Sequence, residues 1–215
     1  MGAIDKLKGK VGNYALNRKL KDLKRNVKAC NIDKAKSIGI VFNASQPVSF
    51  DIVRELAKEF DGKKHQLQVL GYFNNTEVFD HYLYRKNFEF FTPKEINWYR
   101  KPSGDVVDNF INTKFDILFD LSIKDNFSLH YIVSTSAAHF KVGKYNEGAT
   151  HLDFMISLEQ EKIALKGLKS EVQKEKKNKK NGSLSGNGNL SDSSVELELN
   201  FLIHELMHYL KLIKN

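Results

Sequence analysis

The chain has 215 residues, which is enough for one α/β domain with a substantial core but short for two domains. Its single cysteine, Cys30, excludes an intramolecular disulfide framework and fits a reducing compartment. The sequence contains neither a signal-peptide core nor an apolar run long enough to span a membrane, so we expect a cytoplasmic protein.

The net charge of +8 is concentrated in two segments. Residues 1–36 contain nine Lys and two Arg against three Asp, a net charge of +8. A second cluster, residues 161–181, has eight Lys against three Glu, a net charge of +5, so the rest of the chain sums to about −5. Charge separated in this way favours appendages that contact an anionic partner.

Residues 1–36 are predicted to form a basic arm, a helix followed by a linker. One helical face carries the apolar residues Ile4, Leu7, Val11 and Tyr14. The nearly opposite face carries Leu16, Leu20, Leu23 and Val27. The stripe changes side near Gly12, so either the helix breaks there or a continuous helix contacts different surfaces with its two halves.

The cations of the arm are the candidate nucleic-acid-binding residues: Lys6, Lys8, Lys10, Arg18, Lys19, Lys21, Lys24, Arg25 and Lys28. We expect a non-enzymatic protein that binds RNA or a ribonucleoprotein such as the ribosome through them. Two alternatives stay open: a solvated helix docked on its own domain, and a peripheral membrane-surface helix that inserts its leucines into anionic lipid. A chain without residues 1–28 is expected to fold, because the first core strand begins at Ser37.

Residues 37–160 are predicted to form the α/β domain. Strands are expected at residues 37–42, 67–73, 88–91, 115–121, 141–143 and 154–158. One helix is expected after Ser49 as its cap, and a second after a capping box of Thr92 and Glu95. A third is expected to begin at Ser103, and a fourth to follow the apolar stripe from Leu129 to Phe140. This alternation predicts a three-layer Rossmann-like domain with a mostly parallel sheet of five or six strands.

The β-α-β unit that the sequence predicts most clearly spans residues 115–143, FDILFDLSIKDNFSLHYIVSTSAAHFKVG. This stretch resembles the corresponding unit in the N-terminal half of heptosyltransferase-type glycosyltransferases, where a strand ending in Asp-Leu leads into a helix. The whole chain resembles a family of small uncharacterised bacterial α/β proteins with no assigned activity. Both resemblances imply a fold, and neither transfers a functional residue to this chain.

No cofactor is expected. The first strand-to-helix turn reads NASQPVS, and neither G-x-G-x-x-G nor G-x-x-x-x-G-K-[ST] occurs, so the usual nucleotide phosphate sites are missing from the sequence. A candidate acid/base site at the carboxyl edge of the sheet comprises Asp116, Asp120, Asp125 and His130. Helix capping and solvation are the more common roles for such residues, and we favour them.

Trp98 and Tyr99 precede the cations Arg100 and Lys101. If they are exposed, these rings are suited to stacking on bases. A lone tryptophan beside a helix end is more often an anchor in the core, and we expect that role for Trp98.

Residues 161–194 predict a low-complexity, disordered insertion, and residues 195–215 predict a helix packed on the domain. This helix contains H-E-L-M-H, which resembles the zinc-binding helix of zincin metalloproteases, with His204 and His208 as ligands and Glu205 as base. Because Leu202, Leu206 and Leu210 lie on the opposite face, ordinary packing turns the motif to solvent. We therefore expect no metal site, and a zinc metalloprotease is the alternative function.

Overall fold

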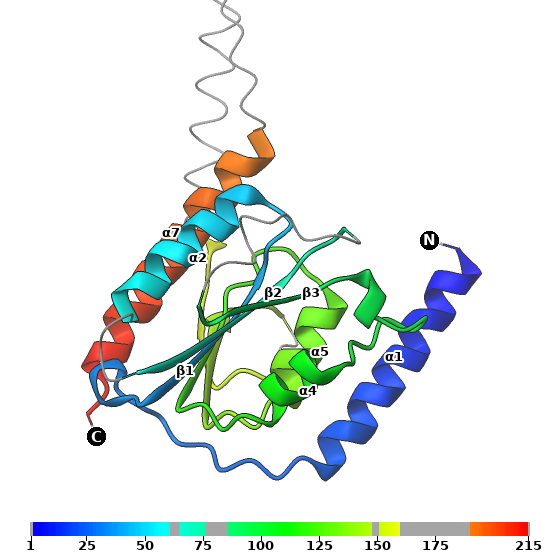
Figure 1. Ribbon diagram of the computed structural model, residues 1–215, viewed down its shortest axis with the longest axis horizontal. Coiled ribbons are helices and arrows are strands. Elements are labelled where there is room, and N and C mark those ends of the chain that lie inside the picture. Colours follow the sequence, from blue (N-terminus) through cyan, green and yellow to red (C-terminus); the bar gives the residue numbers. More distant parts are fainter. Residues whose placement is uncertain (1, 61–64, 76–85, 148–150, 160–189, 215) are drawn as a thin grey trace, which may run out of the picture.

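The structure, a computed structural model, describes residues 2–60, 65–75, 86–147, 151–159 and 190–214 (Figure 1). Within these residues the strands are β1 (Ser37–Asn43), β2 (Gln66–Tyr72), β3 (Phe88–Phe91), β4 (Ile117–Asp120), β5 (Phe140–Lys144) and β6 (Phe154–Ile156). They form one sheet in the order β3-β2-β1-β4-β5-β6, and all five neighbouring pairs are parallel. The predicted Rossmann-like α/β class is confirmed.

Helices cover both faces of this sheet. The described α-helices are α1 (Ala3–Asp22), α2 (Pro47–Phe60), α4 (Asp105–Asn112), α5 (Phe127–Thr135) and α7 (Leu190–Leu212). Figure 1 shows α2 and α7 side by side on one face, with α4, α5 and the N-terminal α1 on the other. The three predicted layers are therefore present.

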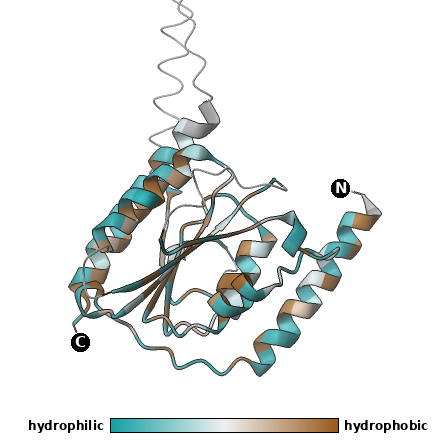
Figure 2. Ribbon diagram, viewed as in Figure 1, coloured by the Kyte–Doolittle hydropathy of each residue, from teal (hydrophilic) through white to brown (hydrophobic). Residues whose placement is uncertain are grey.

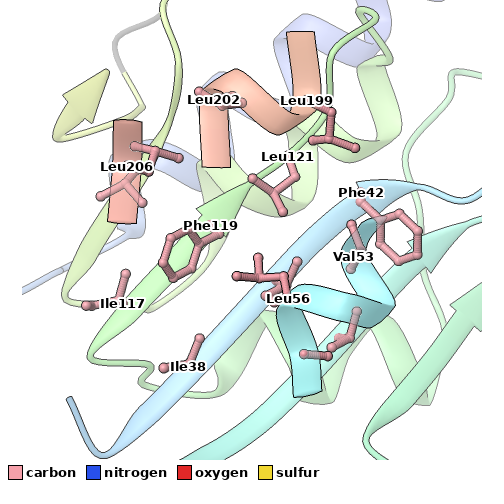
Figure 3. Packing of buried hydrophobic residues seen from close by; sticks show 14 of the residues in the cluster. Ile38, Phe42, Val53, Leu56, Ile117, Phe119, Leu121, Leu199, Leu202 and Leu206 are labelled. Atoms are coloured by element: carbon pink, nitrogen blue, oxygen red, sulfur yellow. The ribbon is translucent and has the colours of Figure 1, made fainter. Parts of the chain in front are cut away.

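The larger core lies between the sheet and the α2–α7 pair. Figure 3 shows Ile38 and Phe119 of the central strands facing Leu56 of α2 and Leu206 of α7. A smaller core under α4 and α5 contains Val41 of β1, which points to the opposite face of the same strand. Because the central strands are buried on both faces, their sequences read as continuous apolar runs, which is why they could be predicted.

Several predicted element ends differ from the observed ones. α2 begins at Pro47, two residues before the expected cap at Ser49, because proline suits the first position of a helix. The capping box of Thr92 and Glu95 is present, but it starts a 3₁₀ turn of three residues, Pro93–Glu95. α5 ends at Thr135, not at Phe140, because the following amides bond elsewhere: His139 N donates to the carbonyl oxygen of Phe115 at 2.8 Å.

One predicted segment falls largely outside the described residues. The insertion expected at residues 161–194 includes residues 161–189. The C-terminal helix begins at Leu190, five residues before the predicted boundary at residue 195.

Candidate functional site

α1 is one continuous helix that lies against α5 through a single face. Leu16 is buried and Leu20 is half-buried against the α4–α5 core. Gly12 permits the close approach, since a Cβ atom there would lie 2.6 Å from the carbonyl oxygen of Tyr99. Ile4 and Tyr14, on the other face, are each 70% exposed. The helix therefore does not break at Gly12. Its two apolar stripes lie on two faces, of which one packs on the domain.

The outward side of the arm is strongly basic. Figure 2 shows α1 as a mainly hydrophilic helix with scattered hydrophobic positions. Seven of the nine predicted cations are exposed: Lys6, Lys10, Arg18, Lys19, Lys21, Lys24 and Lys28. Lys8 is half-buried, beside the domain.

Arg25 is a correction to the predicted nucleic-acid-binding set. Its guanidinium forms an ion pair with Asp153, and the two side chains are only 12% and 16% exposed. The same carboxylate accepts a hydrogen bond from Lys141 N at 2.8 Å. Arg25 therefore holds the linker against the start of β6 and is not available to a partner.

Further bonds attach the linker to the domain. Lys28 N donates to the carbonyl oxygen of His139 at 3.1 Å, and the side-chain amide of Asn31 donates to the carbonyl oxygens of Lys211 and Ile213, each at 2.9 Å. Deleting residues 1–28 would remove Leu16 from the core as well as the Arg25 ion pair. Substitution of the exposed cations is therefore the cleaner test of the arm.

A pocket of about 340 Å³ lies at the carboxyl edge of the sheet. It is next to the point where the chain order reverses between β1 and β4, which is where open α/β sheets bind ligands. Asp120, Asp125 and His130 of the predicted acid/base set line it, together with His151, which the sequence reading missed. The pocket also contains the side chains Ser122, Asn126 and Asn146.

Asp116, the remaining member of the predicted set, lies at the opposite end of β4. Its carboxylate accepts hydrogen bonds from Lys36 N at 2.7 Å and Ser37 N at 3.0 Å. This carboxylate therefore joins the linker to the amino edge of the sheet, and the proposed four-residue cluster does not form.

Two imidazoles lie against one another in the pocket. The rings of His130 and His151 meet edge to face with their centroids 4.3 Å apart. Burial, then the neighbouring His130 and Lys141, lowers the pKa of His151 to about 3. Burial also lowers the pKa of His130, against the opposing effect of Asp125, and burial raises the pKa of the Asp120 carboxyl. At neutral pH the pocket offers uncharged imidazoles, which suit hydrogen bonding more than anion binding.

Stability is expected to fall as the pH drops below about 6.5, and His151→Gln should reduce that fall. In the unfolded chain His151 takes up a proton near its ordinary pKa of 6.5, whereas in the folded chain it does so only near pH 3. The folded state thus loses stability between these two values. Urea midpoints measured at about pH 7.5 and about pH 5 test this expectation. His208→Gln on the exposed side of α7 is the control, and an equal change in both variants would contradict it.

The H-E-L-M-H motif faces outward from α7. His204 and His208 are exposed, while Leu202, Leu206 and Leu210 are fully buried, so the predicted orientation of the helix is confirmed. His204 Nδ1 lies 3.1 Å from a carboxylate oxygen of Glu205. Within the described part of the chain, no group of three His, Cys, Asp or Glu side chains is arranged to hold a metal ion.

Trp98 is a second correction, because it is 58% exposed and does not anchor the core. It stands in a tight turn that Ile96 and Pro102 close by antiparallel pairing. The side-chain oxygen of Asn97 accepts hydrogen bonds from the amides of Tyr99 and Lys101, at 3.2 and 2.9 Å. The turn therefore holds the indole outward.

A groove of about 480 Å³ lies beside this turn. Lys8 of α1, Asn74 after β2, Trp98 and Arg100 are among its lining residues. The groove and the carboxyl-edge pocket share residues 125–127 before and at the start of α5, so the two hollows adjoin. Together they extend from the basic arm to the two imidazoles.

No described helix is long and apolar enough to cross a membrane. No curated protein and no solved structure matches the chain. The model of a family of unknown function, DUF6913, matches residues 8–174, which include most of α1, the whole sheet and the carboxyl-edge pocket. The chain therefore belongs to this family of unknown function.

Proposed function

We propose that this protein binds RNA, free or in a ribonucleoprotein such as the ribosome, in the cytoplasm through the outward side of its basic arm. The observation that carries the proposal is the set of seven exposed cations on a segment fixed to the domain by its other side. A helix of 20 residues is about 30 Å long, comparable to about nine phosphates along one strand of a duplex. Docking presents these cations without the cost of ordering a free arm.

The distribution of charge orients such a partner. Outside residues 1–36 and 161–181 the chain carries about −5, so an RNA strand is attracted to the arm more than to the rest of the chain. Only Arg25 of the nine predicted cations is taken up by a buried ion pair. The remaining eight are candidates for phosphate contacts.

Packing favours RNA over a membrane surface. The lipid alternative required insertion of Leu16, Leu20, Leu23 and Val27. Leu16 and Leu20 instead contact α5 and its neighbours, and of the four only Val27 is exposed. Ile4, Leu7 and Tyr14 are exposed, but three apolar side chains on one helix supply little insertion area. RNA binding through phosphate contacts needs only the cations and no inserted apolar side chain.

The test is binding of labelled RNA over a range of salt concentrations, with anionic liposomes as the competing partner. The logarithm of the affinity should fall linearly with the logarithm of salt, by about 0.7 for each phosphate contacted on a single strand. Sedimentation with ribosomes from lysate should likewise be lost at moderate salt. Failure to bind RNA at about 50 mM salt, or binding to liposomes alone, would overturn the proposal.

A further inference from the structure

The indole of Trp98 is exposed, and the turn that carries it is held by several hydrogen bonds. Arg100 in the same turn has φ 69°, a left-handed conformation that an arginine seldom adopts. Arg100 N donates to the carbonyl oxygen of Asn97 at 3.0 Å, and Asn97 N donates to that of Lys101 at 3.0 Å. A backbone held in a rarely populated conformation to present an aromatic ring points to a binding role.

Neighbouring helices support the turn from two sides. Ser128 Oγ at the start of α5 donates to the carbonyl oxygen of Arg100 at 2.9 Å. The carbonyl oxygen of Tyr99 lies against Gly12 of α1, and Arg100 forms an ion pair with Asp5 of α1 at 3.3 Å. The ring of Tyr99 meets that of Trp98 edge to face, with centroids 5.3 Å apart. The turn that carries the indole is therefore fixed relative to the basic arm.

The groove beside Trp98 has the composition of a nucleotide site. Lys8 supplies positive charge, as does Arg100, which is paired with Asp5. The side-chain oxygens of Asn74, Asn97 and Asn126 already accept bonds within the protein, so these residues offer their amide N–H groups as donors. Among the described residues that line the groove, Asp125 is the one carboxylate, at the side shared with the carboxyl-edge pocket. A flat ring, cations for a phosphate and amides for a base edge occur together here.

We infer that this groove holds one unstacked nucleotide of single-stranded RNA, with its base on the ring of Trp98 and its phosphate near Lys8. The inference rests on the proposed function, because the strand reaches the groove along α1. The groove adds a preference for single strands, which the cations alone do not give. Bases in a duplex are stacked on one another and cannot reach the indole, so single strands are the class that the groove selects.

The fluorescence of the protein tests the inference directly, because Trp98 is its only tryptophan. A single-stranded RNA of about twelve nucleotides should quench the emission in proportion to binding measured by anisotropy of a labelled RNA. A blunt duplex and inorganic polyphosphate should bind the arm with little quenching. If single-stranded RNA binds without quenching, the inference is wrong although the proposed function stands. If no RNA binds, both fail.

Substitution of Trp98 supplies the second measurement. Trp98→Ala should weaken binding of the single strand by about tenfold or more, and Trp98→Phe should restore most of it, since stacking needs only an aromatic face. Duplex affinity should change less than about twofold in both variants. Tyr209→Ala, an exposed aromatic on α7 across the sheet, is the matched control. An equal loss for single strand and duplex, or a Trp98 surface that captures a protein and not RNA, would overturn the inference.

Discussion

Replacing Lys6, Lys10, Arg18 and Lys21 together with glutamine is expected to weaken RNA binding roughly several hundred-fold at 0.1 M salt. All four side chains are exposed, whereas Gly12 and Leu16 on the docked side of α1 are buried. If each contacts one phosphate of a single strand, the salt dependence should become shallower by about 2.8 units of log affinity per log salt. Filter binding or anisotropy at several salt concentrations measures both quantities.

A matched control separates position from total charge. Lys58, Lys114, Lys211 and Lys214 are also exposed but belong to other elements. Their joint replacement with glutamine removes the same charge and should change affinity by less than about threefold, since distant surface charges are screened. Equal losses in the two variants would mean that net charge, and not the arm, governs binding. Both variants should keep the wild-type unfolding midpoint, because none of these substitutions removes a buried side chain.

The sheet was predictable because its strands are apolar runs. Most residues of β1 and β4 are Ile, Val, Leu or Phe, and runs this short between polar turns favour strands over helices. Helix ends were not predictable in the same way. α5 ends where the chain turns to pair β5 with β4, and that pairing depends on residues far along the chain.

The candidate site shows the same division. Charge on the arm could be read locally, but the burial of Arg25 depends on Asp153, which is 128 positions away in sequence. His151 meets His130 only because β5 lies next to β4, so no local pattern connected them. The exposure of Trp98 could not be predicted from residue propensities, because the hydrogen bonds that the side chain of Asn97 accepts determine how the turn presents the indole.

One misassignment was avoidable from the sequence. Asp116 and Asp120 are four residues apart on one strand, and each residue of a strand advances by about 3.3 Å. Their backbones are therefore about 13 Å apart, at opposite edges of the sheet. Strand geometry alone could therefore have shown that Asp120 lies at the carboxyl edge and that Asp116, which bonds to Ser37, does not.

The C-terminal helix provides the last large expected effect. Leu206→Ala should lower the free energy of unfolding by about 2–5 kcal/mol, because its side chain is fully buried in the core that α7 and α2 form with the sheet (Figure 3). His204→Ala and His208→Ala, on the exposed side of the same helix, should each change it by less than about 0.5 kcal/mol. Urea unfolding followed by circular dichroism measures all three variants.

The same three variants decide between packing and metal binding as the role of α7. A structural zinc ion held by His204 and His208 would contribute folding free energy, so losing either ligand would then destabilise the protein. If α7 acts through its leucines, the histidine variants stay stable and elemental analysis of the purified wild-type protein finds no stoichiometric zinc. Stoichiometric zinc that disappears in His204→Ala would instead support the metalloprotease alternative, with Glu205 placed between the two ligands as its base.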